Sequence, residues 1–112
     1  MDSQRQIRFG ELIRNLISDC LLKEDFYESN INSESITVSF VKMSKDLKIA
    51  NVYFMPLGGE NQNKLLNALN ENKYVFQKYL SLAKLQSKFT PKIKFYIDDT
   101  FEEAEKISKL LQ

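Results

Sequence analysis

The sequence predicts one α+β domain over residues 1–112, built as a three-stranded sheet with helices on one face. The main observation is the spacing of apolar residues, which changes along the chain from helical to alternating and then repeats that change. Composition is the second observation, since 43% of the residues are hydrophobic and 28% are charged, as in ordinary globular domains. A chain of 112 residues is long enough for one core, so we expect no second domain.

A first helix is predicted by the stretch "FGELIRNLISDCLL", residues 9–22. Its apolar side chains follow the i, i+3, i+4, i+7 spacing of an amphipathic helix. They are Phe9, Leu12, Ile13, Leu16, Ile17, Cys20 and Leu21. Because Cys20 belongs to this stripe, we expect it to be a small buried hydrophobe rather than a reactive thiol. Polar residues 23–35 predict a connecting loop.

Two strands are predicted over residues 36–41 and 49–55 from their alternating side chains. The connection between them is too short for a helical crossover, which favours antiparallel pairing. Pro56 is expected to end the second strand. The side chains expected to face inward are Ile36, Val38, Phe40, Ala50, Val52 and Phe54.

A helical pattern resumes over residues 63–88 and is interrupted at 70–73, where "NENK" is a poor helix interior and predicts a bend. The polar side of the helix after the bend is predicted to carry Gln77, Ser81, Lys84 and Lys88. Its aromatic residues Phe76 and Tyr79 fall on the apolar side and are expected in the core.

A third strand is predicted in "TPKIKFYI", residues 90–97, by renewed alternation. Ile93, Phe95 and Ile97 are expected to face inward, with Lys92 and Lys94 outward. After it, Thr100 and Glu103 form a capping-box pattern that opens a short C-terminal helix. The full order is α-β-β-α-(kink)-α-β plus this short helix, which is the topology of a type II KH domain, an RNA-binding module.

Several chemistries are excluded by composition. The chain has no His, one Cys and no Trp, and so lacks the usual parts of a zinc site, a Ser-His-Asp triad or a Cys-His nucleophile. We therefore expect no enzyme activity and no cofactor. An acidic metal site is a weak alternative, because carboxylates at a helix start are explained by the helix dipole. Its residues would be Asp98, Asp99, Glu102 and Glu103.

The first residues lack the apolar core of a signal peptide, and no later run approaches the length of a membrane span. We therefore expect a cytoplasmic protein without a membrane partner. The single cysteine cannot form an intramolecular disulfide, which agrees with this expectation.

The charges are segregated although the formal net charge is only +1. Residues 73–97 contain six Lys and no Asp or Glu, which leaves ten basic residues against 15 acidic residues elsewhere. Such segregation gives one surface a positive field, which suits a polyanionic partner. A solvated lysine face without a partner is the alternative interpretation.

Four pieces of the chain, in this order, resemble the bacterial ribosome-binding factor A family. They are "IRFGELIRNLISDCL" with Arg8, "VKMSKDLKIANVYF", "FTPKIKFYID" and "EEAEKISKLL". The second piece is the most specific, with Ser44, Asp46, Leu47, Ala50, Val52 and Tyr53. The resemblance covers nearly the whole chain.

This resemblance implies a non-catalytic KH-like domain that binds the immature small (30S) ribosomal subunit. It would contact the 16S-type rRNA and assist late rRNA processing and ribosome biogenesis, with particular importance in cold adaptation. The family lacks the Gly-x-x-Gly loop of ordinary KH domains and has instead a helix kink marked by Ala-x-Gly. This chain also lacks Gly-x-x-Gly, and its kink position reads Lys73-Tyr74-Val75 without glycine.

The predicted RNA-binding residues are mostly lysines, which suit recognition of phosphates by charge and shape. Tyr53, Tyr74 and Tyr96 are left as candidates for base stacking, whereas Phe95 is expected in the core. The binding set is Lys78, Lys84, Lys88, Lys92 and Lys94, with Arg8, Lys73, Ser44 and Lys45.

Two alternatives stay open. Ser44 and Asp46 are turn-formers whose short side chains bond nearby backbone, so "SKD" either fixes the strand pairing or presents Ser44 and Lys45 to RNA. The whole domain is either an RNA-binding factor or a protein-interaction module of α+β fold without nucleic-acid binding, in which the lysines only solubilise. In both cases a monomer is the simplest expectation.

Overall fold

The computed structural model describes residues 2–24, 36–56, 62–83, 85 and 89–98. Their elements are α1 (Gln4–Lys23), β1 (Ile36–Met43), β2 (Ile49–Pro56), α2 (Gln62–Glu71), α3 (Lys73–Leu82) and β3 (Lys92–Ile97). This order confirms the predicted α+β, KH-like type II fold, and Pro56 ends β2 as expected. The predicted C-terminal helix lies outside the described residues.

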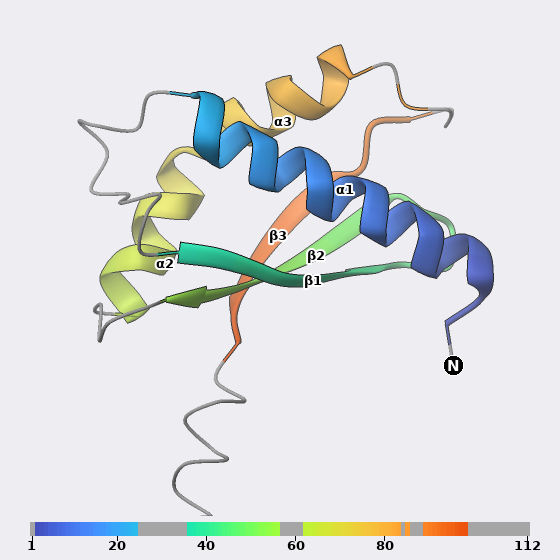
Figure 1. Ribbon diagram of the computed structural model, residues 1–112, viewed down its shortest axis with the longest axis horizontal. Coiled ribbons are helices and arrows are strands. Elements are labelled where there is room, and N and C mark those ends of the chain that lie inside the picture. The colour runs from blue at the N-terminus through green and yellow to red at the C-terminus, as the bar shows by residue number, and fades with distance from the viewer. Residues whose placement is uncertain (1, 25–35, 57–61, 84, 86–88, 99–112) are drawn as a thin grey trace, which may run out of the picture.

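The sheet has the strand order β1-β2-β3, with β1 antiparallel and β3 parallel to the central β2. The parallel pair needs a crossover, which α2 and α3 provide. Helices α1 and α3 lie over the same side of the sheet (Figure 1). No helix in the described ranges is long and apolar enough to cross a membrane.

Helix α1 begins with a capping box that also ties it to the sheet. The Ser3 hydroxyl accepts a hydrogen bond from the Gln6 amide at 3.2 Å, and the Gln6 side-chain oxygen accepts one from the Ser3 amide at 2.8 Å. The Gln6 Nε2 then donates to the Met43 carbonyl at the end of β1, at 3.1 Å. A buried polar side chain is thereby satisfied at both ends.

The closest approach of α1 to the sheet is at Gly10. A Cβ atom on this glycine would lie 2.6 Å from the Val41 carbonyl oxygen, which is a backbone atom. Glycine at this position therefore lets the helix backbone pack directly on β1.

The core fills the space between the helices and one face of the sheet. Phe54 on β2 is fully buried, and its ring contacts those of Phe76 on α3 and Phe95 on β3 at centroid distances of 6.5 and 5.5 Å. This aromatic cluster joins α3 to two strands. The predicted inward residues are confirmed here at Ile36, Val38, Ala50, Val52, Phe54 and Ile93.

Cys20 is fully buried in this core, which confirms the expected role as a small hydrophobe. Burial, and then the nearby charge of Glu24, raise the pKa of its thiol to about 12.

Only the thiolate reacts readily with alkylating agents. We expect iodoacetamide at pH 8 to leave native Cys20 unmodified for hours and to modify it fully in urea, as followed by mass spectrometry. Rapid modification without denaturant would contradict this placement.

The prediction that Phe40 faces inward is wrong. The register of β1 against β2 shifts between Val38 and Phe40, so that Ser39 is an extra residue in β1. An inserted residue reverses the alternation beyond it. Phe40 is consequently 41% exposed on the other face, while Val41 packs against the core in its place.

The predicted bend is confirmed at Asn72, between α2 and α3. Its amide nitrogen Nδ2 donates to the Ala68 carbonyl at 2.8 Å, satisfying a carbonyl at the end of α2. Its own carbonyl accepts from the Val75 amide at 3.0 Å, which starts α3. The bend thus forms without glycine.

Helix α3 ends earlier than predicted, at Leu82 rather than Lys88. The Ala83 amide donates to the Leu80 carbonyl at 3.2 Å, three residues back, which tightens the last turn. Gln77, which is predicted on the polar side of this helix, donates from its Nε2 to the Pro91 carbonyl at 2.6 Å. This bond fixes α3 to the chain that enters β3.

Candidate functional site

The β1–β2 turn is held by its own side chains. The Ser44 hydroxyl donates to Asp46 Oδ1 at 2.7 Å and accepts from the Ile49 amide at 3.0 Å. Asp46 Oδ1 also accepts from the Lys48 amide at 3.1 Å. These bonds confirm that Ser44 and Asp46 satisfy backbone groups and fix the strand pairing. Contact of Ser44 and Lys45 with RNA stays a prediction, and Lys45 is exposed.

Leu47 is the residue that this turn constrains. It has a φ of 60°, in the left-handed region that non-glycine residues seldom adopt. Leu47 is nevertheless only 6% exposed and lies within the main hydrophobic cluster. Burial of the leucine side chain and the Ser44–Asp46 bonds therefore offset the backbone strain.

The turn hydrogen bonds make stability dependent on the charge of Asp46. Bonds from the Ser44 hydroxyl and the Lys48 amide lower the pKa of this carboxyl below its usual 3.8. A carboxyl with a lowered pKa in the folded state stabilises the fold above its unfolded pKa, and that contribution is lost as the pH falls through the folded pKa. Asp46→Asn should therefore be less stable than the parent chain at pH 7, with the difference shrinking below about pH 4.

Nuclear magnetic resonance titration of the Asp46 carboxyl would measure this shift directly. We expect its midpoint to lie below the midpoint in the urea-unfolded chain, and Ser44→Ala to move it upward because the strongest hydrogen bond is removed. A folded midpoint equal to or above the unfolded one would contradict the turn geometry.

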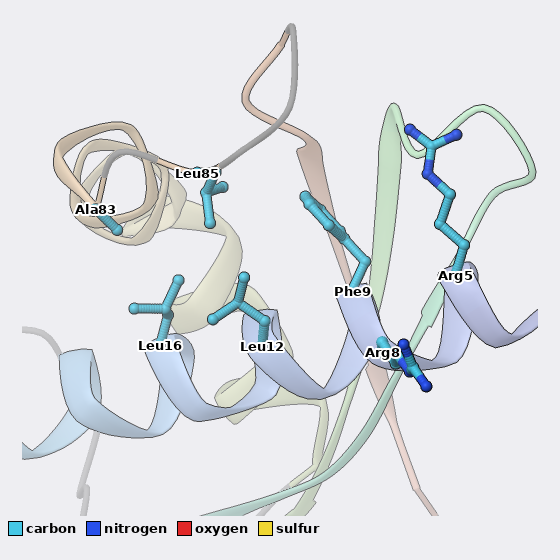
Figure 2. Close-up of a pocket in the computed structure, with 7 residues that line it drawn as sticks. All are labelled: Arg5, Arg8, Phe9, Leu12, Leu16, Ala83 and Leu85. Atoms are coloured by element: carbon cyan, nitrogen blue, oxygen red, sulfur yellow. The ribbon is translucent and has the colours of Figure 1, made fainter.

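A groove of about 590 Å³ lies between α1 and the end of α3. Figure 2 shows Leu12 and Leu16 pointing from α1 toward Leu85, with Phe9 beside them. Two arginines flank this apolar floor at the start of α1, one of them the predicted Arg8. The groove therefore combines apolar surface with positive charge. Its lining residues are Arg5, Arg8, Phe9, Leu12, Leu16, Ala83 and Leu85.

The predicted RNA-binding lysines do not form one surface. Lys73 and Lys78 belong to α3, in the helical layer. Lys92 and Lys94 are exposed on the opposite face of the sheet, because the β3 residues that alternate with them are buried. Lys84 and Lys88 lie outside the described residues. The segment 73–97 is thus continuous in sequence but divided between two sides of the domain.

Lys73 has a further contact that reduces its freedom. Its ammonium nitrogen lies 5.9 Å from the centroid of the Phe95 ring, in cation–π range. Lys78 is exposed on α3. Among the helical lysines that the structure describes, Lys78 is therefore better placed than Lys73 to meet a partner.

Two basic residues were missed by the sequence reasoning. Arg5 lies three residues before Arg8, a spacing that puts both on one side of a helix, so the signal was present in the sequence. Lys42 on β1 pairs with Asn51 on β2, and Asn51 pairs with Lys94 on β3. Lys42 therefore lies on the same outer face of the sheet as the predicted Lys94. Finding Lys42 required the shifted register of β1.

The three residues left as stacking candidates are all at least partly exposed, with Tyr74 at 70% and Tyr96 at 39%. Tyr74 lies on α3, away from the other two. Tyr53 and Tyr96 stack on each other with ring centroids 5.0 Å apart. Phe40 stacks on Tyr53 from the other side at 4.3 Å.

The described residues hold no group of three His, Cys, Asp or Glu side chains that could bind a metal ion. Three of the four carboxylates in the alternative metal site lie outside those residues. What the described surfaces offer is positive charge, exposed aromatic rings and an apolar groove. Fold and surface together define a small KH-like binding domain.

The chain belongs to the ribosome-binding factor A family, whose profile, described as Ribosome-binding factor A, matches residues 5–111. It is 43% identical to Ribosome-binding factor A of Afipia carboxidovorans over 110 residues, 98% of this chain and 77% of that protein. Identity to the Pelagibacter ubique protein of the same name is also 43%, covering 98% of this chain and 89% of that one.

Structural neighbours confirm the fold. A putative ribosome binding factor A from Thermotoga maritima superposes with a TM-score of 0.69 at 25% identity, covering 86% of this chain and 89% of that one. A Thermus thermophilus ribosome binding factor A, as a homology model fitted into the cryo-EM map of a 30S complex, gives a TM-score of 0.60 at 16% identity, with coverages of 84% and 96%.

Proposed function

We propose that this chain, as one domain over residues 1–112, binds the immature small ribosomal subunit and assists late rRNA processing. It would act without catalysis, as a cytoplasmic monomer, by contacts to 16S-type rRNA. The family match over residues 5–111 carries this proposal. The 30S complex in which a structural neighbour was placed supports the choice of the small subunit.

The basic residues supply the physical means of binding. Arg5 and Arg8 flank the α1 groove, and Lys45, Lys78, Lys92 and Lys94 are exposed. Lysine and arginine that neutralise phosphates release counterions, so the affinity falls as salt rises. Neutralising about four phosphates gives a slope of log K against log[salt] of roughly −3 to −4.

Co-sedimentation with purified small subunits, with large subunits as the control, tests the proposal. We expect selective pelleting with small subunits that weakens across a salt series. A Lys84→Glu/Lys88→Glu variant should pellet less well, and so should Arg8→Glu. The matched control is Lys23→Glu/Lys64→Glu, which changes the net charge as much as the first variant at exposed positions outside residues 73–97.

Two results would contradict the proposal. Equal pelleting with both subunits, or no pelleting with either, would contradict specific binding to the small subunit. Selective pelleting that is independent of salt and of the charge reversals would favour the protein-interaction module, with the apolar groove beside α1 as its surface.

The proposed role in the cold predicts a growth defect of a deletion strain that is larger at low temperature.

A further inference from the structure

The face of the sheet opposite α1 and α3 carries a row of three aromatic rings. Phe40, Tyr53 and Tyr96 lie opposite one another on β1, β2 and β3. The rings stack across the strands, with centroid distances of 4.3 and 5.0 Å and interplanar angles of 20° and 21°. Phe40 and Tyr96 stand on the two outer strands and are 41% and 39% exposed.

A row of polar side chains runs beside the aromatic row. Lys42, Asn51 and Lys94 lie opposite one another on the same three strands. Lys42 follows Phe40 by two residues and Lys94 precedes Tyr96 by two, so each outer ring has a lysine on its own strand, roughly 7 Å along it. Both lysines are exposed, as is Lys92 farther along β3.

No Asp or Glu occurs in β1, β2 or β3, so the outward side of these strands is free of negative side chains. Among the described residues, the carboxylates that follow these strands in the sequence are Asp46 in the β1–β2 turn and Asp98 after β3. Asp46 is engaged with Ser44 and the Lys48 amide. The charge on this face therefore suits a polyanion.

We propose that this open face of the sheet binds a single-stranded segment of RNA. Bases would stack on the outer faces of Phe40 and Tyr96 and extend the existing row of rings, while Lys42 and Lys94 would contact the phosphates. Stacking on aromatic side chains requires unpaired bases, which distinguishes this surface from one that reads the shape of a duplex. The inference rests on the proposed RNA-binding function and adds where, and in which form, the RNA is held.

The geometry favours RNA over an apolar protein surface. The three rings are already stacked on one another, so their free π faces lie at the two ends of the row, beside the lysines. A protein partner would need to satisfy Lys42, Lys92 and Lys94 with carboxylates. A strand of RNA instead carries its phosphates beside its bases, as this face carries lysines beside rings.

The test uses fluorescence anisotropy of labelled 12-nucleotide oligouridylate and of a 12-base-pair RNA duplex. Phe40→Leu and Tyr96→Leu keep an apolar side chain but remove the ring, and each should weaken oligouridylate binding roughly 5- to 150-fold. Tyr96→Phe should bind like the parent chain. Lys94→Gln should reduce the magnitude of the slope of log K against log[salt] by about one. Tyr74→Leu removes the exposed ring on α3, the stacking candidate that lies away from this face. Because the inference places no base there, a loss of binding as large as that of Tyr96→Leu would contradict it.

The outcomes separate this inference from the proposed function. If the parent chain pellets with small subunits but does not bind oligouridylate, or binds the duplex as tightly, the inference is overturned and the function stands. Unchanged oligouridylate binding by Phe40→Leu and Tyr96→Leu also overturns it. If the leucine variants keep subunit binding while Phe40→Asp loses it, the face is an apolar protein-docking surface instead. Thermal unfolding of every variant checks that the fold is retained.

Discussion

Replacing Phe54 with Ala is expected to lower the free energy of unfolding by about 3–5 kcal/mol. The side chain is fully buried on the central strand β2, and its ring contacts Phe76 and Phe95. Its removal leaves a cavity between α3 and two strands. Phe76 and Phe95 cannot move into this cavity without losing their own packing contacts. Because a domain of this size has a total stability of roughly 5–15 kcal/mol, the loss is a large part of the whole.

Urea unfolding followed by circular dichroism measures this change. Tyr74→Ala is the control, since it removes an aromatic ring of similar size that is 70% exposed on α3. We expect the control to change stability by less than about 0.5 kcal/mol. Equal losses for the two variants would show that Phe54 is not packed as described.

Replacing Gly10 with Val is expected to destabilise the protein by about 3 kcal/mol, the upper end for overpacking. A Cβ atom at this position would lie 2.6 Å from the Val41 carbonyl oxygen. The atom it meets is backbone in β1, so relief requires α1 to move away from the sheet. Gly10→Ala should also destabilise, although alanine is the better helix former.

The sign of the alanine effect is the decisive measurement. Asn15→Ala, at an exposed position on the same helix, should stabilise by roughly 0.5 kcal/mol through helix propensity alone. Thermal and urea unfolding of both variants give the comparison. A stabilising Gly10→Ala would mean that α1 does not approach β1 this closely.

Much of the fold could be predicted because local pattern and tertiary packing agree. The apolar stripe around Ile13 and Ile17 is buried as its spacing indicates, and alternation in β2 places Val52 and Phe54 in the core. The bend was predicted from "NENK" because Asn is a poor helix interior, and Asn72 does form it by bonding the backbone with its side chain.

The face of Phe40 could not be predicted from alternation. Ile36, Val38 and Phe40 form a regular pattern in sequence, and only the pairing with β2 reveals that Ser39 is an extra residue. The positions of the candidate binding residues likewise depend on tertiary packing that the sequence pattern does not reveal. Lys78 and Lys94 are close in sequence, but the first lies in a helix on one side of the sheet and the second on the other, which depends on how α3 packs.

The central position of β2 has a consequence for synthesis of the chain on the ribosome. β2 can pair with β1 as soon as both have emerged, but its other edge waits for β3, which begins at Lys92 after both crossover helices. At ordinary translation rates this delay is on the order of seconds. During that interval the nascent chain has an open edge able to pair with another polypeptide. Chains truncated before Lys92 should therefore aggregate. In the complete chain, β3 pairs with this edge of β2, so that the edge can no longer pair with another polypeptide.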